Sequence, residues 1–300
     1  MQALLDRLRA GDIVVGDGAW GTMLMARGLK PGRAPEVFNL TEPEVLEAIA
    51  RLYLEAGAEI ITTNTFGGCP VRLRQSGLDH ETEAINRAGV EAVRRAVGDR
   101  AYVSASVGPC GHVLKPYGDA DPAEIATGFE RQIRALASAG IDLLCIETMT
   151  DLTEAILAVR AARAVAPQVP VVATMTFEPT RRGFFTVMGN SVGQTVQGLL
   201  DAGADIVGSN CGNGIQIMVE IAREFRARTP GLLAIQSNAG LPEHRAGEIV
   251  YPDAPGFMAE QAAVLADLGV AIIGGCCGTT PAHIQAIRRV VEARGRRPLS

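Results

Sequence analysis

Short apolar runs with strand-forming residues alternate with amphipathic helical stretches eight times along this chain of 300 residues. The runs that predict strands are residues 13–15, 59–63, 101–106, 142–146, 171–176, 205–208, 232–236 and 270–273. The stretches that predict helices are residues 43–56, 81–97, 122–139, 152–164, 192–202, 214–228, 256–268 and 281–293. Apolar strands that alternate with helices are typical of a parallel sheet covered by helices.

A weak internal repeat favours a closed barrel over an open sheet. In four places a helix ends at glycine and a strand follows at once: EAGAEIITTN, SAGIDLLCIE, DAGADIVGSN and DLGVAIIGGC. Glycine suits the left-handed conformation that ends a helix. Eight such units predict a single-domain α/β fold, a (β/α)8 (TIM) barrel, over residues 1–300, with 295–300 as a frayed tail. A doubly wound sheet is the alternative, but the G-x-G-x-x-G fingerprint is absent.

Composition excludes several classes of function. A net charge of −5 gives no bulk attraction for nucleic acid or for an anionic membrane, so neither is an expected partner. No apolar run approaches the roughly 20 residues of a membrane span, and the N-terminus has no signal-peptide layout, so we expect a cytoplasmic protein. Six cysteines in 300 residues are not a disulfide framework.

Three thiols follow strands of the predicted barrel. Cys211 comes after the sixth strand, and Cys276 and Cys277 come after the eighth. Residues after barrel strands meet at one end, and three sulfur ligands with an open fourth position suit a catalytic Zn²⁺. Small buried hydrophobic residues are the alternative interpretation, which we prefer for Cys145, and redox sensing is a lesser one. The roles of two further cysteines in loops after strands are left open: Cys69 and Cys110.

A zinc ion held by three thiolates is a weak Lewis acid for water and favours a soft fourth ligand. A substrate thiol is such a ligand, and it loses its proton on coordination. The site therefore suits alkylation of a thiol better than hydrolysis of an amide. The four histidines form no zinc-binding motif, and we expect His283 at the surface of the last helix.

Polar groups at other strand ends suit an amino-acid ligand. Asp17 follows the first strand and Glu147 the fourth, where either can accept an α-ammonium group. Backbone N–H groups of the segment from Gly18 through Ala19 and Gly21 to Thr22 can hold a carboxylate. Asn238, after the seventh strand, can orient a ligand or occupy the open metal position. Turn, cap and structural hydrogen-bond roles are the alternatives for these residues.

The chain resembles the homocysteine S-methyltransferase family, in particular the homocysteine-binding barrel of cobalamin-dependent methionine synthase. The segments that carry the resemblance are GDGAWGTML, TTNTFGG, ETMTDLTEA, GSNCGNG, SNAGLP and GGCCGTTPAHI, in the family's order. It implies zinc on Cys211, Cys276 and Cys277, with the homocysteine sulfur as fourth ligand. It further implies Asp17 and Glu147 near the homocysteine amino group, the Gly18–Gly21 backbone near its carboxylate, and Asn238 beside the metal.

Departures from the family pattern leave the methyl donor open. Trp20 stands where the family usually has Met, residues 177–192 are unlike the Ser-Gly-rich loop of the full synthase, and pterin- and cobalamin-binding modules are missing from the 300 residues. We expect homocysteine to be methylated to methionine from methylcobalamin on another domain or on a separate corrinoid protein. The alternatives are a stand-alone enzyme that uses S-methylmethionine or betaine, and a non-catalytic thiol-binding module of a larger methyltransferase system.

Overall fold

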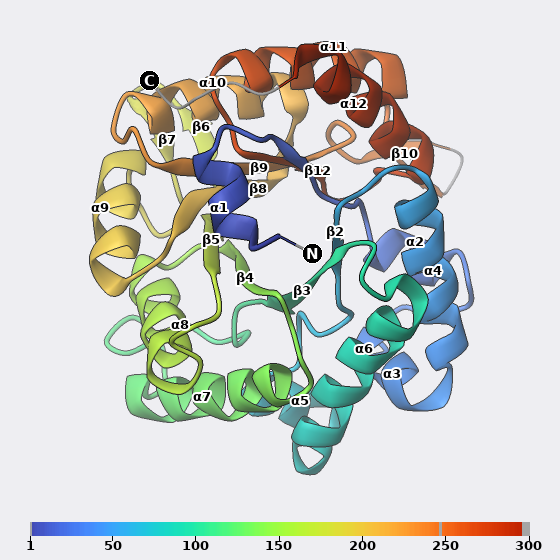
Figure 1. Cartoon of the computed structure of the whole chain (residues 1–300). Coiled ribbons are helices and arrows are strands. Elements are labelled where there is room, and N and C mark those ends of the chain that lie inside the picture. The colour runs from blue at the N-terminus through green and yellow to red at the C-terminus, as the bar shows by residue number, and fades with distance from the viewer. Residues whose placement is uncertain (1, 246–247, 296–300) are drawn as a thin grey trace.

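Eight parallel strands surround a common axis in the computed structural model, which describes residues 2–245 and 248–295 (Figure 1). Their order around the barrel is β1 (Val14–Val15), β12 (Ile272–Gly275), β9 (Leu232–Asn238), β8 (Ile206–Gly214), β5 (Val171–Met175), β4 (Leu143–Met149), β3 (Tyr102–Val107) and β2 (Ile60–Thr62). Two hydrogen bonds close the ring between β2 and β1: Glu59 N–H to Val15 O at 2.8 Å and Asp17 N–H to Ile60 O at 3.0 Å. The predicted (β/α)8 barrel is confirmed.

A helix follows each strand of the barrel and packs outside it (Figure 1). These helices are α4 (Pro43–Glu55), α6 (Thr82–Val97), α7 (Pro122–Ser138), α8 (Leu152–Val165), α9 (Val192–Ala202), α10 (Ile215–Arg226), α11 (Pro255–Asp267) and α12 (Pro281–Arg294). N-cap residues fix where two of these helices begin. Before α7 the Asp121 carboxylate accepts the Ala123 N–H at 2.9 Å, and before α8 the Asp151 carboxylate accepts the Thr153 N–H at 2.8 Å.

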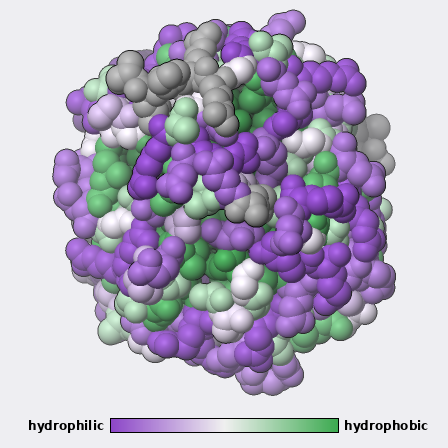
Figure 2. Space-filling view, in the orientation of Figure 1, coloured by the Kyte–Doolittle hydropathy of each residue, from purple (hydrophilic) through white to green (hydrophobic). Residues whose placement is uncertain are grey.

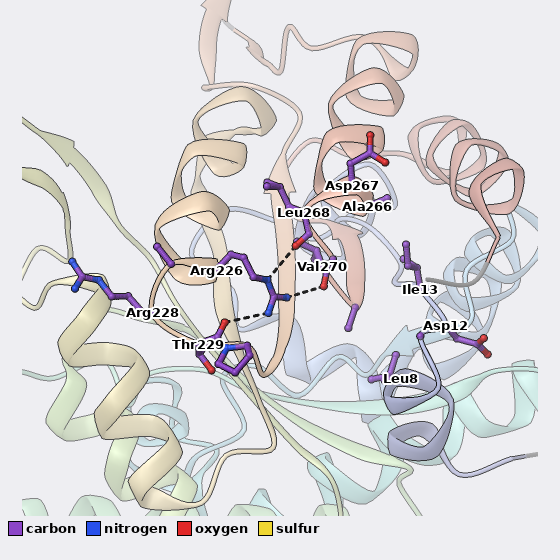
Figure 3. Close-up of a pocket in the computed structure, with 15 residues that line it drawn as sticks. Leu8, Asp12, Ile13, Arg226, Arg228, Thr229, Ala266, Asp267, Leu268 and Val270 are labelled. Atoms are coloured by element: carbon purple, nitrogen blue, oxygen red, sulfur yellow. Dashed lines mark hydrogen bonds between the residues drawn. The ribbon is translucent and has the colours of Figure 1, made fainter. Parts of the chain in front are cut away.

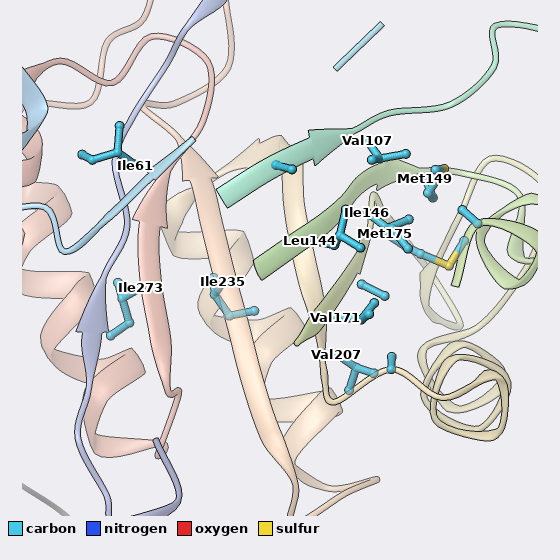
Figure 4. Close-up of a cluster of buried hydrophobic side chains, with 14 of the residues drawn as sticks. Ile61, Val107, Leu144, Ile146, Met149, Val171, Met175, Val207, Ile235 and Ile273 are labelled. Atoms are coloured by element: carbon cyan, nitrogen blue, oxygen red, sulfur yellow. The ribbon is translucent and has the colours of Figure 1, made fainter. Parts of the chain in front are cut away.

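Alternating side chains of the strands form two separate apolar layers. Outward side chains such as Ile61, Leu144 and Ile235 pack against the helices in the larger buried cluster (Figure 4). Inward ones such as Ile60 and Leu143 belong to a second cluster inside the barrel. Because successive side chains of a strand point to opposite faces, this division follows directly from the continuous apolar runs in the sequence.

A short helix that the periodicity did not predict, α1 (Leu4–Arg9), lies across one end of the barrel (Figure 1). Its Leu4 and Leu8 are buried with the inward side chains of the strands, so they cover the hydrophobic interior at this end. Hydrophilic side chains predominate on the face of the molecule seen from this side (Figure 2). The open end of the barrel is therefore the opposite one, where the strands have their carboxyl ends.

Two loops at the carboxyl ends of strands contain antiparallel hairpins that the sequence did not predict. Strands β6 (Glu178–Thr180) and β7 (Gly183–Phe185) follow β5, and β10 (Glu243–Arg245) and β11 (Glu248–Val250) follow β9. Of the predicted frayed tail, residues 296–300 lie outside the described residues. Within the described part of the chain, no helix is long and apolar enough to span a membrane.

Candidate functional site

The sulfur atoms of Cys211, Cys276 and Cys277 converge at the open end of the barrel. Each lies within 4.8 Å of the other two, and the Sγ atoms of Cys211 and Cys277 are 4.0 Å apart. Within residues 2–245 and 248–295, this is the only group of three or more His, Cys, Asp or Glu side chains spaced to hold a metal ion. The three cysteines line a cavity of about 540 Å³ together with Asp17 and Glu147.

An irregularity in β8 directs Cys211 toward the other two cysteines. The parallel ladder with β9 pairs Asn210 with Gln236 and next pairs Gly214 with Asn238, so the residues between them leave the regular register. Cys211 itself has a φ of 59°, which is uncommon for a residue with a side chain. Such bulges re-aim side chains and are frequent beside functional sites.

The Cys276–Cys277 turn is fixed by hydrogen bonds to the end of β9. The Cys276 N–H donates to Ser237 O at 2.7 Å, and Cys277 O accepts the Ala239 N–H at 3.0 Å. The Thr279 hydroxyl donates to Cys276 O at 2.7 Å and folds the turn back on itself. A Cβ at Gly275 would lie 2.3 Å from the Thr279 Oγ1 atom, so glycine is required before the cysteine pair.

Hydrogen bonds among the sulfurs favour a thiolate on Cys277. The thiols of Cys211 and Cys276 and the Tyr251 hydroxyl donate to it, which holds the pKa of Cys277 far below that of a free thiol. The pKa of Cys276 is raised, because it donates to Cys211 and Cys277 and is repelled by their charge. The pKa of Cys211 is raised overall. The hydrogen bond that it accepts from Cys276 lowers this pKa, but the one that it donates to Cys277 and its burial raise it by more. Without a metal the cluster therefore carries its negative charge on Cys277, and a cation would favour ionisation of the other two thiols as well.

Asp17 is a buried carboxylate held by hydrogen bonds from both sides. Its Oδ2 atom accepts the Trp20 indole N–H and the Thr62 backbone N–H, each at 2.8 Å, and its Oδ1 atom accepts the Thr62 hydroxyl at 2.8 Å. Burial raises the pKa of Asp17 to about 6, and these hydrogen bonds limit the rise. Trp20, the residue that departs from the family pattern, thus positions this carboxylate.

Glu147 lies in a second irregular segment, in β4, and its carboxylate faces the same cavity. The Ser106 hydroxyl donates to its Oε1 atom, and the Asn210 side-chain amide donates to its Oε2 atom at 3.3 Å. Burial raises the pKa of Glu147 to about 7; the Ser106 hydrogen bond opposes the rise, and the charges of Asp17 and Cys211 add to it. A cationic ligand group would relieve this penalty at both carboxylates.

Asn210 connects the cysteine cluster to Glu147. Its Oδ1 atom accepts the Thr148 backbone N–H at 2.7 Å and the Thr174 hydroxyl at 2.8 Å, and its Nδ2 atom donates to the Thr148 hydroxyl at 2.8 Å. Thr148 has a φ of 58°, and these bonds hold that left-handed conformation. Because Asn210 precedes Cys211 in the chain, one buried side chain orients both the bulge of β4 and that of β8.

The predicted Gly18–Gly21 segment also lines the cavity. The Ala19 N–H donates to the Thr279 hydroxyl at 3.1 Å, so this amide already has an acceptor. The role of Gly18, Ala19 and Gly21 toward a ligand carboxylate stays a prediction. Asn238 is buried and does not line the cavity, but its Oδ1 atom has no hydrogen-bond partner among the described residues.

Other predictions for single residues had mixed outcomes. His283 is not at the surface: it is buried, its Nε2 atom lies 2.9 Å from Asp253 O, and its Nδ1 atom accepts the Thr280 N–H in the cap of α12. Cys145 is buried inside the barrel, as we expected. Cys69 and Cys110 are buried and lie outside the cysteine cluster.

Sequence reasoning missed three residues that shape the site. Two of them stand inside the segments that carried the resemblance: Asn210 in GSNCGNG and Thr279 in GGCCGTTP. A polar side chain next to a candidate ligand was the available signal for both. Tyr251 comes from the loop after the β10–β11 hairpin and gave no comparable signal.

Comparisons with known proteins show the family and the fold of the chain. A family model described as homocysteine S-methyltransferase matches residues 14–291. Methionine synthase of Mycobacterium tuberculosis is 34% identical over 93% of this chain, and that of Mycobacterium leprae is 32% identical over 96%. The chain spans about a quarter of the length of these relatives, 24% and 25%. The solved structure of the Escherichia coli homocysteine methyltransferase MmuM, metallated form, has a TM-score of 0.79 at 23% identity over 98% of this chain and 99% of that one, which shows the same fold.

Glu147→Gln tests the raised pKa of this carboxyl group in the metal-free protein. Between the ordinary value of 4.5 and about 7, the folded protein keeps a proton that the unfolded chain releases. The free energy of unfolding of the wild type therefore falls as the pH rises from about 5 to about 8. Urea unfolding should show that this fall is smaller in the variant by about 1–2 kcal/mol, a value discounted for partial exposure.

Glu178→Gln is the matched control, since Glu178 is an exposed acid of β6 on the same end of the barrel. Its pH dependence of unfolding should equal that of the wild type. An equal fall in Glu147→Gln and in the wild type would contradict the raised pKa.

Proposed function

The chain belongs to the homocysteine S-methyltransferase family, and we propose that it is a zinc-dependent enzyme that methylates homocysteine to methionine. The observation that carries the proposal is the meeting of three cysteine sulfurs with one buried and one half-buried carboxylate in one cavity. The sulfurs suit a soft metal ion and a thiol, and the carboxylates suit the ammonium group of an amino acid. Homocysteine carries both a thiol and an ammonium group.

The residues present fit a zinc ion. Cys211, Cys276 and Cys277 supply three sulfur ligands, and the unpartnered Oδ1 atom of Asn238 belongs to the strand whose end holds the cysteine turn. When bound there, zinc would keep an added thiol deprotonated and nucleophilic at neutral pH. We assign the three cysteines as its ligands and Asn238 as the residue beside it.

The two carboxylates have different capacities to bind the ammonium group. Asp17 already accepts three hydrogen bonds, so little of its acceptor capacity remains. Glu147 accepts only two that the structure describes, of which the one from Asn210 is long, at 3.3 Å. We therefore assign Glu147 as the main acceptor for the ammonium group and Asp17 as a supporting charge, with the backbone of Gly18, Ala19 and Gly21 near the carboxylate.

Methyl transfer then needs no further acid or base from the chain. The homocysteine sulfur, its thiol proton already released to solvent, attacks the methyl carbon of the donor. A new S–C bond forms, and the leaving group departs with the electron pair of the broken bond. The fixed positions of Asp17 and Glu147 orient the substrate for this attack.

We infer that the donor is a methyl-corrinoid carried by another domain or protein. The methionine synthases that the chain matches are about four times its length, so three quarters of each lies outside the aligned barrel. The alternatives are a small donor, S-methylmethionine or betaine, and a thiol-binding module without turnover of its own.

Cys211→Ala should abolish zinc binding, because it removes one of the three sulfur ligands. We expect zinc measured by elemental analysis to fall from about one per chain to below about a tenth, and methionine formation to fall with it. The barrel should stay folded, as judged by circular dichroism. Cys69→Ala is the control, since Cys69 is a thiol outside the cluster that is buried more deeply than Cys211. A zinc-free Cys211→Ala variant that forms methionine at the wild-type rate would overturn the proposal.

The methyl donor can be identified by supplying homocysteine with one donor at a time. We expect methionine with methylcobalamin and none with S-methylmethionine or betaine. Turnover with either small donor alone would replace the corrinoid proposal with the stand-alone alternative. No methionine with any donor, while homocysteine still binds, would indicate a thiol-binding module.

A further inference from the structure

The four sequence repeats in which a helix ends at glycine differ at one position. This position lies at the end of the barrel opposite to the cysteine cluster. Two residues after the glycine, three of the repeats carry an acid: Glu59, Asp142 and Asp205. The fourth carries Ala271. All four positions lie where a strand begins, at the end opposite to the cysteine cluster.

In the acidic repeats, the carboxylate pairs with an arginine of a neighbouring helix. The Nη2 atom of Arg94 donates to Gly140 O at 2.9 Å and to Asp142 Oδ2 at 2.6 Å. Arg163 repeats the arrangement, with its Nε atom on Gly203 O at 2.7 Å and its Nη2 atom on Asp205 Oδ2 at 2.5 Å. Glu59 pairs likewise with Arg7 and Arg288. Each cation is thus neutralised beside the glycine that ends a helix.

The fourth repeat keeps the arginine and lacks the acid. Arg226 donates to Leu268 O at 3.1 Å, Gly269 O at 2.8 Å, Thr229 O at 3.1 Å and Gly231 O at 2.9 Å. No carboxylate is among its hydrogen-bond partners in the part of the chain that the structure describes. The Arg226 Nη2 atom donates one proton to Gly269 O, as the Arg94 Nη2 atom does to Gly140 O. For the second Nη2 proton, Ala271 stands at the position where the repeat of Arg94 has the acceptor Asp142. Burial lowers the pKa of Arg226.

A cavity of about 460 Å³ opens at this position (Figure 3). Its lining includes Arg226, Ala271 and Ile13, and of its apolar side chains Ile13 is half-buried whereas Leu8 and Val270 are buried in the core. This volume lies in the range of small-molecule sites. The Arg226 guanidinium lies centrally among the side chains of Figure 3.

The acids that line the cavity do not replace the missing partner. Asp12 pairs with Arg7 at 3.0 Å, and Asp267 pairs with Arg294 at 3.2 Å. The carboxylates of both point away from the guanidinium of Arg226 in Figure 3. Among the described residues, the hydrogen-bond partners of Arg226 are therefore backbone carbonyl oxygens alone. The second cation of the lining, Arg228, is exposed and points away from the cavity in Figure 3.

We propose that this cavity binds the carboxylate group of a small organic acid, which takes the place that Asp142 and Asp205 fill in their repeats. The carboxylate accepts the remaining Nη2 proton of Arg226, and the apolar body of the acid lies against Ile13. The site is separate from the methyl-transfer site, because it lies at the opposite end of the barrel.

The test compares the wild type with Ala271→Asp, which restores the acid of the other repeats, and with the neutral isostere Ala271→Asn. Sodium butyrate should raise the melting temperature of the wild type above that in matched sodium chloride, by roughly 2–4 °C at ten times its dissociation constant. Butyrate should bind more tightly than acetate, and butanol should have no effect. Ala271→Asp should melt higher than the wild type without butyrate and should weaken butyrate binding at least tenfold.

Ala271→Asn should weaken butyrate binding less than Ala271→Asp does, and all three proteins should form methionine equally. An equal response of the wild type and Ala271→Asp to butyrate, or no response of the wild type beyond chloride, would overturn the proposal. If Ala271→Asp does not fold, nuclear Overhauser contacts decide: the butyrate methyl group must contact the Ile13 methyl groups of the wild type, and their absence at saturating butyrate overturns the proposal.

Discussion

Three sulfur atoms that lie within 4.8 Å of one another at one end of a barrel are the constraint on which the rest of the site depends. They come from β8 and from the turn after β12, with β9 between these strands. The chain holds them with a bulge, a glycine-bounded turn and hydrogen bonds from the end of β9. Such an arrangement puts a thiolate at Cys277 beside two further thiols, and ionising these as well is costly without a cation to balance the charge.

The same balance of charge governs the two carboxylates. Burial raises the pKa of Asp17 to about 6 and of Glu147 to about 7, so the empty site is electrostatically unfavourable when both are ionised. Ligand groups of positive charge, a metal ion at the sulfurs and an ammonium group at the carboxylates, relieve this cost. Thr148 and Cys211 both have a positive φ; Asn210 hydrogen-bonds to Thr148 and directly precedes Cys211 in the chain.

Much of the fold follows from local sequence patterns, because eight apolar runs and glycine-ended helices leave few alternatives to a barrel. The short helix α1 was not predicted, because two leucines four residues apart are a weak periodic signal. The two leucines are buried only because they cover the interior of the barrel, which the local sequence does not show. The bulges in β4 and β8 were equally unpredictable, because they depend on hydrogen bonds between strands. His283 was misplaced for the same reason: its partner, Asp253 O, is distant in sequence.

Zinc K-edge X-ray absorption of the zinc-loaded protein, recorded without and with homocysteine, counts the sulfur ligands of the metal. We predict three sulfur neighbours from the protein and a fourth after homocysteine is added. A first shell of mainly nitrogen and oxygen atoms, or a sulfur count that homocysteine leaves unchanged, would contradict it.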